Sequence, residues 1–186
     1  MIPIVPGLTY VPDFILPNDE QALIAFVDGR TWLTDLKRRV QHYGYKYDYK
    51  ARAVTSESAL GSLPDQLQKL AIRLAQEEIF PEPPDQVIVN EYQPGQGISA
   101  HIDCVPCFTE TIVSLSLLSG CSMTLKAAKT GVTRVQYLRP RSLLVLKGES
   151  RYEWQHAIAA RKSDMVDGGR EPRSRRLSLT FRKVIL

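Results

Sequence analysis

Residues 176–182 read Arg-Leu-Ser-Leu-Thr-Phe-Arg, in which polar and apolar side chains alternate without a break. Successive side chains of a β-strand point to opposite faces, so this alternation predicts a half-buried strand. The two faces would carry Leu177, Leu179 and Phe181 on one side, and Arg176, Ser178, Thr180 and Arg182 on the other. The fold must therefore place an apolar layer against one face of this strand and leave a row of hydrogen-bonding groups on the other.

The two arginines of this strand, Arg176 and Arg182, share its polar face. A guanidinium offers planar, paired donors that match a carboxylate, so two of them on one face suit a small dianion. Polar strand faces are also commonly just solvated. Taken alone, the strand leaves both interpretations open.

Metal-ligating residues occur earlier in the chain, as His101-Ile102-Asp103 and as His156. Two imidazoles and one carboxylate on one side of an octahedral ferrous ion leave three positions for a chelating cosubstrate and oxygen. On a strand, His101 and Asp103 would point to one face and Ile102 to the packed face. His156 would have to come from a strand that returns to the same place in a closed β architecture. By itself a His-x-Asp pair is more commonly an ordinary hydrogen-bonded pair.

A third segment, residues 87–92, is an apolar run with β-branched residues and precedes a Pro-Gly turn that leads into His101. This pattern predicts a strand, a turn and a second strand. Asn90 and Tyr92 share a face of the first strand, and both can hydrogen-bond a carboxylate. A tyrosine at a strand end is also commonly half-buried packing with its hydroxyl in water.

Together these motifs resemble the AlkB family of iron(II)- and 2-oxoglutarate-dependent dioxygenases. The resemblance rests on an ordered series: Asn90-x-Tyr92-x-Pro94-Gly95, His101-x-Asp103, His156, and Arg176 with Arg182. It covers about residues 85–184. Residues 38–45 extend it upstream, and residues 148–152 add to it between the metal ligands. Those two stretches are similar to the branch that eukaryotes fuse to an RNA-binding module and a transfer-RNA methyltransferase.

The resemblance implies that His101, Asp103 and His156 ligate Fe(II) and that Arg176 pairs with the distal carboxylate of 2-oxoglutarate. It also implies that Asn90, Tyr92 and Arg182 complete the 2-oxoglutarate pocket. Members of the family use O2 to convert this cosubstrate to succinate and carbon dioxide while they hydroxylate a C–H bond. In demethylases of this kind, the hydroxylated N-methyl group leaves as formaldehyde.

Basic residues are concentrated in two stretches of a chain whose formal net charge is only +4. Residues 37–52 hold six Lys or Arg against one Asp, and residues 161–183 hold eight against three acids. Clustered basic charge suits an anionic partner, of which a polyphosphate backbone is the commonest. A solvated basic face explains the same pattern equally well. The second stretch contains Gly168-Gly169 and Pro172 and no periodicity, which predicts a mobile loop.

Tyrosines alternate through the first basic stretch, at Tyr43, Tyr45, Tyr47 and Tyr49. In an extended strand their rings would share a face, and with Lys46 nearby they would form a platform for stacking bases beside a phosphate track. A strand packed on the core would show the same pattern. In the family this region resembles the lid over the substrate, so we take Tyr43, Tyr45, Tyr47 and Lys46 as candidate substrate contacts.

The expected fold is mostly β with flanking helices: a double-stranded β-helix, or jelly roll, with N-terminal helices packed on one sheet. One helix should open at Asn18-Asp19-Glu20-Gln21 and end at Gly29, and another should start after Ser62 and stop before Pro81. Eight strands are expected near residues 87–92, 98–103, 111–118, 121–127, 132–138, 142–147, 154–160 and 175–184. We interpret residues 1–186 as a single domain, with 1–84 as support and lid and 85–186 as the catalytic core.

Composition favours a soluble monomer in the cytoplasm. The chain is 44% hydrophobic and 24% charged, as in ordinary globular proteins, and no apolar run is long enough to cross a bilayer. The N-terminal residues 1–6 lack the layout of a secretory signal. Three cysteines, including Cys104-x-x-Cys107, argue against a disulfide framework and suit reduced thiols.

The leading hypothesis is therefore an oxidative demethylase or hydroxylase that acts on a modified base in DNA or RNA, with Fe(II), 2-oxoglutarate and O2. An alternative is a dioxygenase for a methylated protein side chain or a small metabolite, because fold and metal site do not determine the substrate. A binding module without turnover is a third alternative, which the complete ligand set disfavours.

Overall fold

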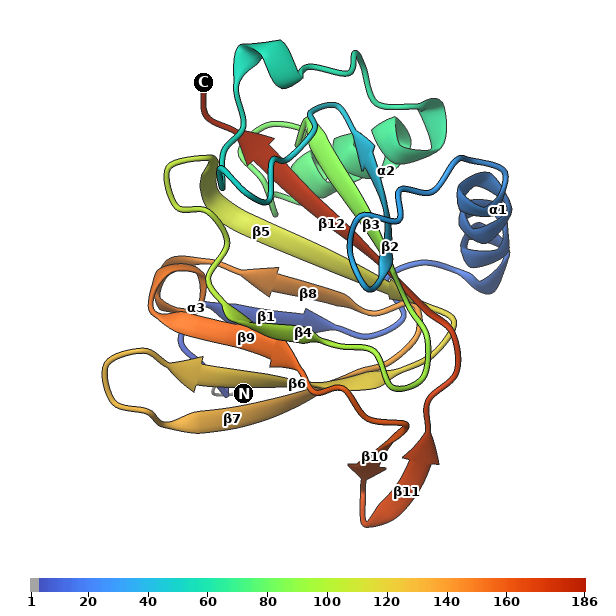
Figure 1. Cartoon of the computed structure of the whole chain (residues 1–186), viewed down its shortest axis with the longest axis vertical. Helices are drawn as coiled ribbons and strands as arrows, with labels where there is room; N and C mark the ends of the chain where they lie inside the picture. The colour runs from blue at the N-terminus through green and yellow to red at the C-terminus, as the bar shows by residue number, and fades with distance from the viewer. Residues whose placement is uncertain (1–3) are drawn as a thin grey trace.

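Two antiparallel sheets face each other in the computed structural model, which describes residues 4–186 (Figure 1). The six-stranded major sheet contains, in spatial order, β1 (Leu8–Val11), β8 (Leu143–Leu146), β5 (Phe108–Leu117), β12 (Arg176–Val184), β3 (Gln86–Tyr92) and β2 (Arg39–Tyr43). The four-stranded minor sheet contains β4 (Ile98–His101), β9 (Trp154–Ile158), β6 (Cys121–Ala127) and β7 (Thr133–Leu138). The predicted jelly roll is confirmed, and strand order in both sheets is far from sequence order.

Helices cover the outer face of the major sheet, as expected. α1 (Pro17–Asp28) begins one residue before the predicted cap, because Pro17 suits the first helical position, and it ends at Gly29. α2 (Asp65–Gln76) follows Pro64 and buries Leu67, Ala71 and Leu74. A short 3-10 turn, η1 (Ser56–Ser58), and a short helix, α3 (Gly148–Tyr152), complete the helical segments of the described chain. None of the described helices is long and apolar enough to cross a membrane.

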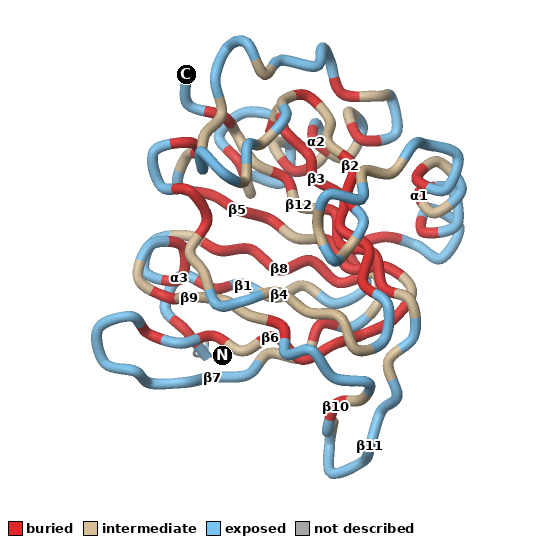
Figure 2. Tube along the Cα trace, in the orientation of Figure 1, coloured by how far each residue is buried: buried red, intermediate tan, exposed pale blue. Residues whose placement is uncertain are grey.

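The strand β12, whose alternation was predicted for residues 176–182, lies between two hydrophobic clusters. Leu177, Leu179 and Phe181 of β12 pack toward the helices. The opposite face of β12 points into the space between the sheets, where Phe108, Ile112, Met123 and Leu144 belong to a second cluster. Figure 2 shows the central strands of the major sheet buried, β9 of the minor sheet mostly intermediate and β7 largely exposed. Because the row of polar residues on β12 lies between two sheets, it borders an enclosed space and not bulk water.

Two short strands of the major sheet were missed by the sequence interpretation. β1 pairs with β8, and β2 pairs with β3, so both belong to the same sheet as β12. The boundary at residue 85 therefore does not separate support from core, because residues of the first part complete the sheet. The N-terminal stretch without a signal layout begins at Met1, and its first three residues lie outside the described range.

The expected mobile loop between residues 161 and 175 is instead a hairpin of β10 (Ser163–Val166) and β11 (Gly169–Pro172), which projects from the body in Figure 1. Its base is held by the buried carboxylate of Asp164, which pairs with Arg161 at 2.7 Å and with Arg173 at 2.6 Å. The prediction failed because this ion pairing gives the segment an anchor that local composition does not show.

The cysteines also differ from expectation. Cys104 and Cys107 are joined by a disulfide across the turn that follows Asp103, while Cys121 is free and buried on β6. The tight turn of the Cys-x-x-Cys stretch brings the two Cα atoms to 5.3 Å, a separation that a disulfide spans. The expectation of reduced thiols was wrong for this pair. The cysteines therefore no longer support the expectation of a reducing compartment.

Candidate active site

The register of the minor sheet brings the three expected metal ligands together. His101 on β4 and His156 on β9 are directly opposed cross-strand partners, and their ring centroids lie 4.3 Å apart. One oxygen of Asp103 lies 3.5 Å from Nε2 of His101 and 3.4 Å from Nε2 of His156. One ligand atom from each residue falls within 4.8 Å of the others, so one cation can contact all three. Two imidazoles and a carboxylate on one side of an ion fit ferrous iron.

The local structure around Asp103 differs from the expected strand. β4 ends at His101, so Asp103 lies in the loop that follows, and Ile102 lines the cavity where packing was expected. The loop is fastened by Arg151 of α3, which is almost fully buried and donates to the carbonyl oxygens of Asp103 at 2.9 Å and Cys104 at 3.2 Å. Sequence reasoning gave Arg151 no role, although it lies in the stretch 148–152 that carries part of the resemblance.

The ligands have partners that orient them. Nδ1 of His101 lies 2.7 Å from the carbonyl oxygen of Ser99, which leaves Nε2 free for a metal. Arg182 donates from Nε to the second oxygen of Asp103 at 2.7 Å. Burial works to raise the pKa of Asp103, but Arg182 and the two histidines outweigh it and hold that pKa well below its usual range. Burial lowers the pKa of His156, which keeps its imidazole neutral as a metal ligand must be.

Arg176 is buried in the major sheet with unused donors. One terminal nitrogen, Nη2, donates to Ser116 at 2.8 Å, whereas Nε and Nη1 have no hydrogen-bond partner among the described residues. The residue is 3% exposed and its guanidinium lies 5.4 Å from the ring of Tyr92. A buried guanidinium that lacks a carboxylate is costly. The arrangement therefore fits an anion that the chain itself does not supply, such as the distal carboxylate of 2-oxoglutarate.

The other expected cosubstrate residues lie on the same face. Asn90 and Tyr92 of β3 and Arg182 of β12 line one cavity of about 590 Å³ with the three candidate ligands. Arg176 does not line it but borders a small adjacent void beside Tyr92. Arg182 contacts Asp103, so its observed role is to hold a candidate ligand. Ser114 and Ser178, whose hydroxyls lie 2.9 Å apart, also line the cavity. Ser178 was expected on this face of the strand, but neither serine was predicted as a site residue.

A covering segment, residues 44–60, closes part of this cavity. β2 ends at Tyr43 because Gly44 has φ +76°, and any Cβ there would collide with the carbonyl oxygen of Asp85. The segment then folds back on itself, with Lys46 N donating to Ser58 O at 2.8 Å and Leu60 N to Gly44 O at 2.8 Å. It is irregular, and the extended strand expected from the tyrosine alternation is absent from it.

This bend separates the four tyrosines. Tyr43 packs against Phe26 of α1, with ring centroids 5.8 Å apart, and donates to Gln41, so its ring belongs to the helix-side core. Tyr45 packs on the inter-sheet cluster and Lys46 is exposed; neither lines the cavity. Tyr47 and Tyr49 do line it, together with Arg52 and Arg38. The candidate contacts Tyr43, Tyr45 and Lys46 are therefore not supported, and Tyr49, Arg52 and Arg38 were missed.

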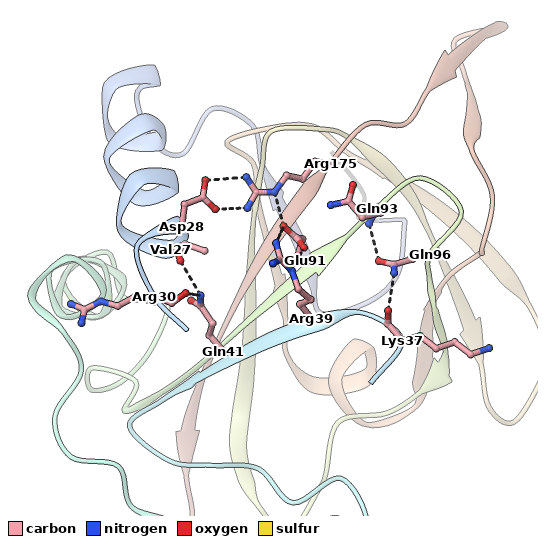
Figure 3. Close-up of polar contacts among 10 residues, drawn as sticks. All are labelled: Val27, Asp28, Arg30, Lys37, Arg39, Gln41, Glu91, Gln93, Gln96 and Arg175. Carbon is pink, nitrogen blue, oxygen red and sulfur yellow. Dashed lines mark hydrogen bonds and ion pairs between the residues drawn. The ribbon is translucent and has the colours of Figure 1, made fainter. Parts of the chain in front are cut away.

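Polar contacts on the helix side set the orientation of β3 (Figure 3). Glu91 points away from the cavity and accepts from Arg39 at 2.6 Å and from Arg175 at 2.6 Å, and Arg175 also binds Asp28 at the end of α1. The hydrogen bond from Arg39 lowers the pKa of Glu91. Because side chains alternate along a strand, this anchor directs Asn90 and Tyr92 toward the cavity.

A second contact in Figure 3 holds the edge of the cavity. Gln96 in the turn before β4 donates to the carbonyl oxygen of Lys37 at 2.8 Å and accepts from the backbone of Gln93 at 2.9 Å. It thus connects the segment before β2 with the segment before β4. The contact fixes the backbone at Lys37, which lines the cavity together with Arg38.

His42 fixes the covering segment and predicts a pH dependence of stability. Its Nδ1 accepts from the backbone N–H of Tyr47 at 3.3 Å, and burial, with Arg182 and Lys46, lowers its pKa to about 4. In the unfolded chain the pKa of His42 is about 6.5, so below this pH His42 binds a proton in the unfolded chain but stays neutral in the folded one. Between pH 7 and pH 5 this residue should therefore cost about 2 kcal/mol of unfolding free energy.

Urea unfolding of the wild type and of His42→Gln at both pH values measures this effect. The loss of stability between pH 7 and pH 5 should be smaller in the variant by about the same 2 kcal/mol. Equal losses in the two proteins would show that His42 titrates normally and does not hold the segment.

Comparison with known proteins agrees with this geometry. Residues 26–182 match the 2OG-Fe(II) oxygenase superfamily. An Arabidopsis thaliana protein named "Alkylated DNA repair protein ALKBH8 homolog" is 40% identical over 97% of this chain, and a mouse "tRNA (carboxymethyluridine(34)-5-O)-methyltransferase ALKBH8" is 37% identical over 96%. This chain spans only 59% and 30% of these two relatives.

The solved structure of OsALKBH1 has the same fold, with a TM-score of 0.77 at 18% identity, over 98% of this chain and 99% of that one. The triad of His101, Asp103 and His156 and the unpartnered guanidinium of Arg176 fit the metal and the dianion that the superfamily uses. The chain therefore belongs to the 2OG-Fe(II) oxygenase superfamily and, within it, to the AlkB family, and it is a dioxygenase that uses Fe(II), 2-oxoglutarate and O2.

Proposed function

We propose that this dioxygenase oxidatively demethylates or hydroxylates a modified base in nucleic acid. The observation that supports this proposal is the distribution of free positive charge. Lys37, Arg38 and Arg52 line the cavity and form no ion pair with any carboxylate of residues 4–186. Lys46 and Lys50, which are exposed on the covering segment, are also without ion pairs in the described chain.

The second basic stretch behaves differently. Arg161 and Arg173 bind Asp164, Arg175 binds Asp28 and Glu91, and Lys183 binds Glu82 and Asp85. Most of its charge is therefore neutralised within the fold. Free charge of the first basic stretch lies along the cavity, at Lys37, Arg38 and Arg52, where it can contact a phosphate backbone flanking the reacting base.

The proposed roles of the site residues follow from their geometry. His101, Asp103 and His156 ligate Fe(II), and Arg176 pairs with the distal carboxylate of 2-oxoglutarate, beside Asn90 and Tyr92. Arg182 orients Asp103 through the bond at 2.7 Å. We also propose that residues 1–186 act as one AlkB-like domain, because β1 and β2 complete the sheet that carries the site.

A base inside a duplex or a folded RNA cannot reach a buried metal, so it must leave its stack. The cavity of about 590 Å³ lies within the size range of small-molecule sites, which is ample for one base. Tyr47 and Tyr49 provide ring surface on one side of it. When bound, iron and 2-oxoglutarate supply the oxidising chemistry; the chain orients the ligands, receives the base and excludes water.

The test is a screen of methylated DNA, RNA and peptide substrates for O2-dependent release of formaldehyde. We expect release from methylated oligonucleotides and none from methylated peptides. Release from peptides alone would replace this proposal with the alternative of a protein-directed dioxygenase. Consumption of 2-oxoglutarate in the absence of any substrate serves as the control that the enzyme is folded and loaded.

Stacking on Tyr47 predicts a further effect. Tyr47→Leu should weaken oligonucleotide binding by about 5- to 100-fold, since one aromatic contact to a base contributes about 1–3 kcal/mol. Iron content and substrate-free consumption of 2-oxoglutarate should stay unchanged. Tyr43→Leu is the matched control, because the ring of Tyr43 faces α1 and does not line the cavity. Equal binding by both variants and the wild type would contradict the stacking role.

A further inference from the structure

The cavity is unusual in the sign of its charge. Of the described residues that line it, Asp103 is the only one with a carboxylate, and this carboxylate is paired with Arg182 at 2.7 Å. Lys37, Arg38 and Arg52 contribute positive charge that no acid in the cavity balances. A substrate that enters therefore meets hydrogen-bond donors and cations, with no free anion to receive it.

Two of the neighbouring acids, Asp48 and Glu91, are bound to other groups. Asp48, on the covering segment, accepts from the backbone of Lys50 at 2.8 Å and of Ala51 at 2.9 Å within its own turn. Glu91 lies on the opposite face of β3, bound to Arg39 and Arg175. To bring either carboxylate into the cavity, these contacts would have to break.

The cofactors do not reverse this sign. A ferrous ion carries two positive charges and 2-oxoglutarate two negative ones, so their formal charges cancel. The electrostatic character of the loaded cavity is then decided by the side chains of this chain. With Asp103 balanced by Arg182, the remaining groups are cationic.

Two of the four aromatic rings that line the cavity are already covered by cations of the protein itself. A methylated ammonium can bind within an aromatic cage by cation–π attraction. Here the guanidinium of Arg182 lies 4.9 Å from the ring centre of Phe108. The ring of Tyr92 is flanked by Arg176 at 5.4 Å and Arg38 at 5.9 Å. The faces of these two rings are thus already used by the protein's own cations.

We propose that this cavity selects a neutral or anionic modified base and rejects a base or side chain with a fixed positive charge. The inference rests on the proposed function and narrows its substrate class. Arg52 and Arg38 can donate to carbonyl oxygens or an acidic group on the base, whereas a cationic base would meet like charge in a partly desolvated space. Arg52 is the group to test because it is exposed and forms no ion pair in the described chain.

The experiment compares isomeric RNA oligonucleotides that differ in the charge of one base. 1-Methyladenine and 3-methylcytosine are cations at neutral pH, whereas N6-methyladenine and N4-methylcytosine are neutral. We expect kcat/KM for loss of the methyl group to favour each neutral isomer by about 10-fold or more. Equal rates, or faster reaction of the cationic isomers, would overturn the inference and leave the proposed function intact.

Reversing the charge at position 52 tests whether the charge of the base or the position of its methyl group causes the difference in kcat/KM. Arg52→Glu should shift the ratio of neutral to cationic turnover toward the cations by about 10-fold or more, while Lys69→Glu on α2 should leave the ratio unchanged. Because each ratio is measured within one variant, losses of folded enzyme cancel. An unchanged ratio in Arg52→Glu counts against the inference.

If no oligonucleotide reacts although 2-oxoglutarate is consumed, the proposed function fails. Equilibrium binding of the same four oligonucleotides then ranks the two charges independently of turnover. Tighter binding of the neutral isomers supports the charge selectivity, and equal or weaker binding refutes it.

Discussion

Replacing Arg176 by methionine should raise the KM for 2-oxoglutarate by about 100-fold, because a buried carboxylate without its partner costs on the order of 2–5 kcal/mol. Nε and Nη1 of this guanidinium have no partner in the described protein, and they are the donors expected to meet the distal carboxylate. Steady-state consumption of 2-oxoglutarate across a wide concentration range measures the effect.

In the absence of 2-oxoglutarate, the same substitution should not lower the melting temperature of the protein. An unpartnered buried charge destabilises a fold, so Arg176→Met should melt at the same temperature as the wild type or higher when 2-oxoglutarate is absent. The rise in melting temperature that 2-oxoglutarate causes in the wild type should vanish in the variant. Arg134→Met, on the exposed strand β7, is the control. A wild-type KM in Arg176→Met would remove this residue from the cosubstrate site.

Asp103→Ala should lower substrate-free turnover by on the order of 10³-fold, because it removes the anionic candidate ligand and leaves Arg182 without its carboxylate partner beside the two imidazoles. Iron bound per chain, measured after dialysis against a weak chelator, should fall in parallel. Asp48→Ala is the matched control, since Asp48 lies on the covering segment and binds only its own turn.

Arg182→Gln distinguishes a ligand from the residue that orients it. This variant should lose about 10- to 100-fold in iron affinity, as is typical when a partner of a metal ligand is removed, with less effect than Asp103→Ala. Its KM for 2-oxoglutarate should change less than that of Arg176→Met. If Arg182→Gln instead raised the KM for 2-oxoglutarate as much as Arg176→Met, Arg182 would belong to the 2-oxoglutarate pocket, as the family resemblance implies. Its contact with Asp103 would then not be its main role.

The sequence determined those features that depend on local periodicity. The alternation along residues 176–182 predicted which side chains of β12 face the helices, and Leu177, Leu179 and Phe181 lie there. On the other face Ser178, Thr180 and Arg182 line the cavity, whereas Arg176 borders the small void beside it. The period of two is a property of the strand itself, so it can be read without knowing the neighbours. The eight predicted strands are present for the same reason, although β4 and β9 end earlier than expected. The two helices are present because their start and stop residues are also local signals.

Only the tertiary structure decided which distant residues meet. The register of β4 against β9 places His101 opposite His156, and the bend at Gly44 sends Tyr43 to the core and Tyr47 to the cavity. Folding also neutralises most of the basic residues between 161 and 183 and leaves Lys37, Arg38 and Arg52 free. Strand register, ion pairing and burial are interactions between segments far apart in the chain. The alternation of one strand decides which face each side chain takes, but which residue of another segment it meets depends on how the strands pair.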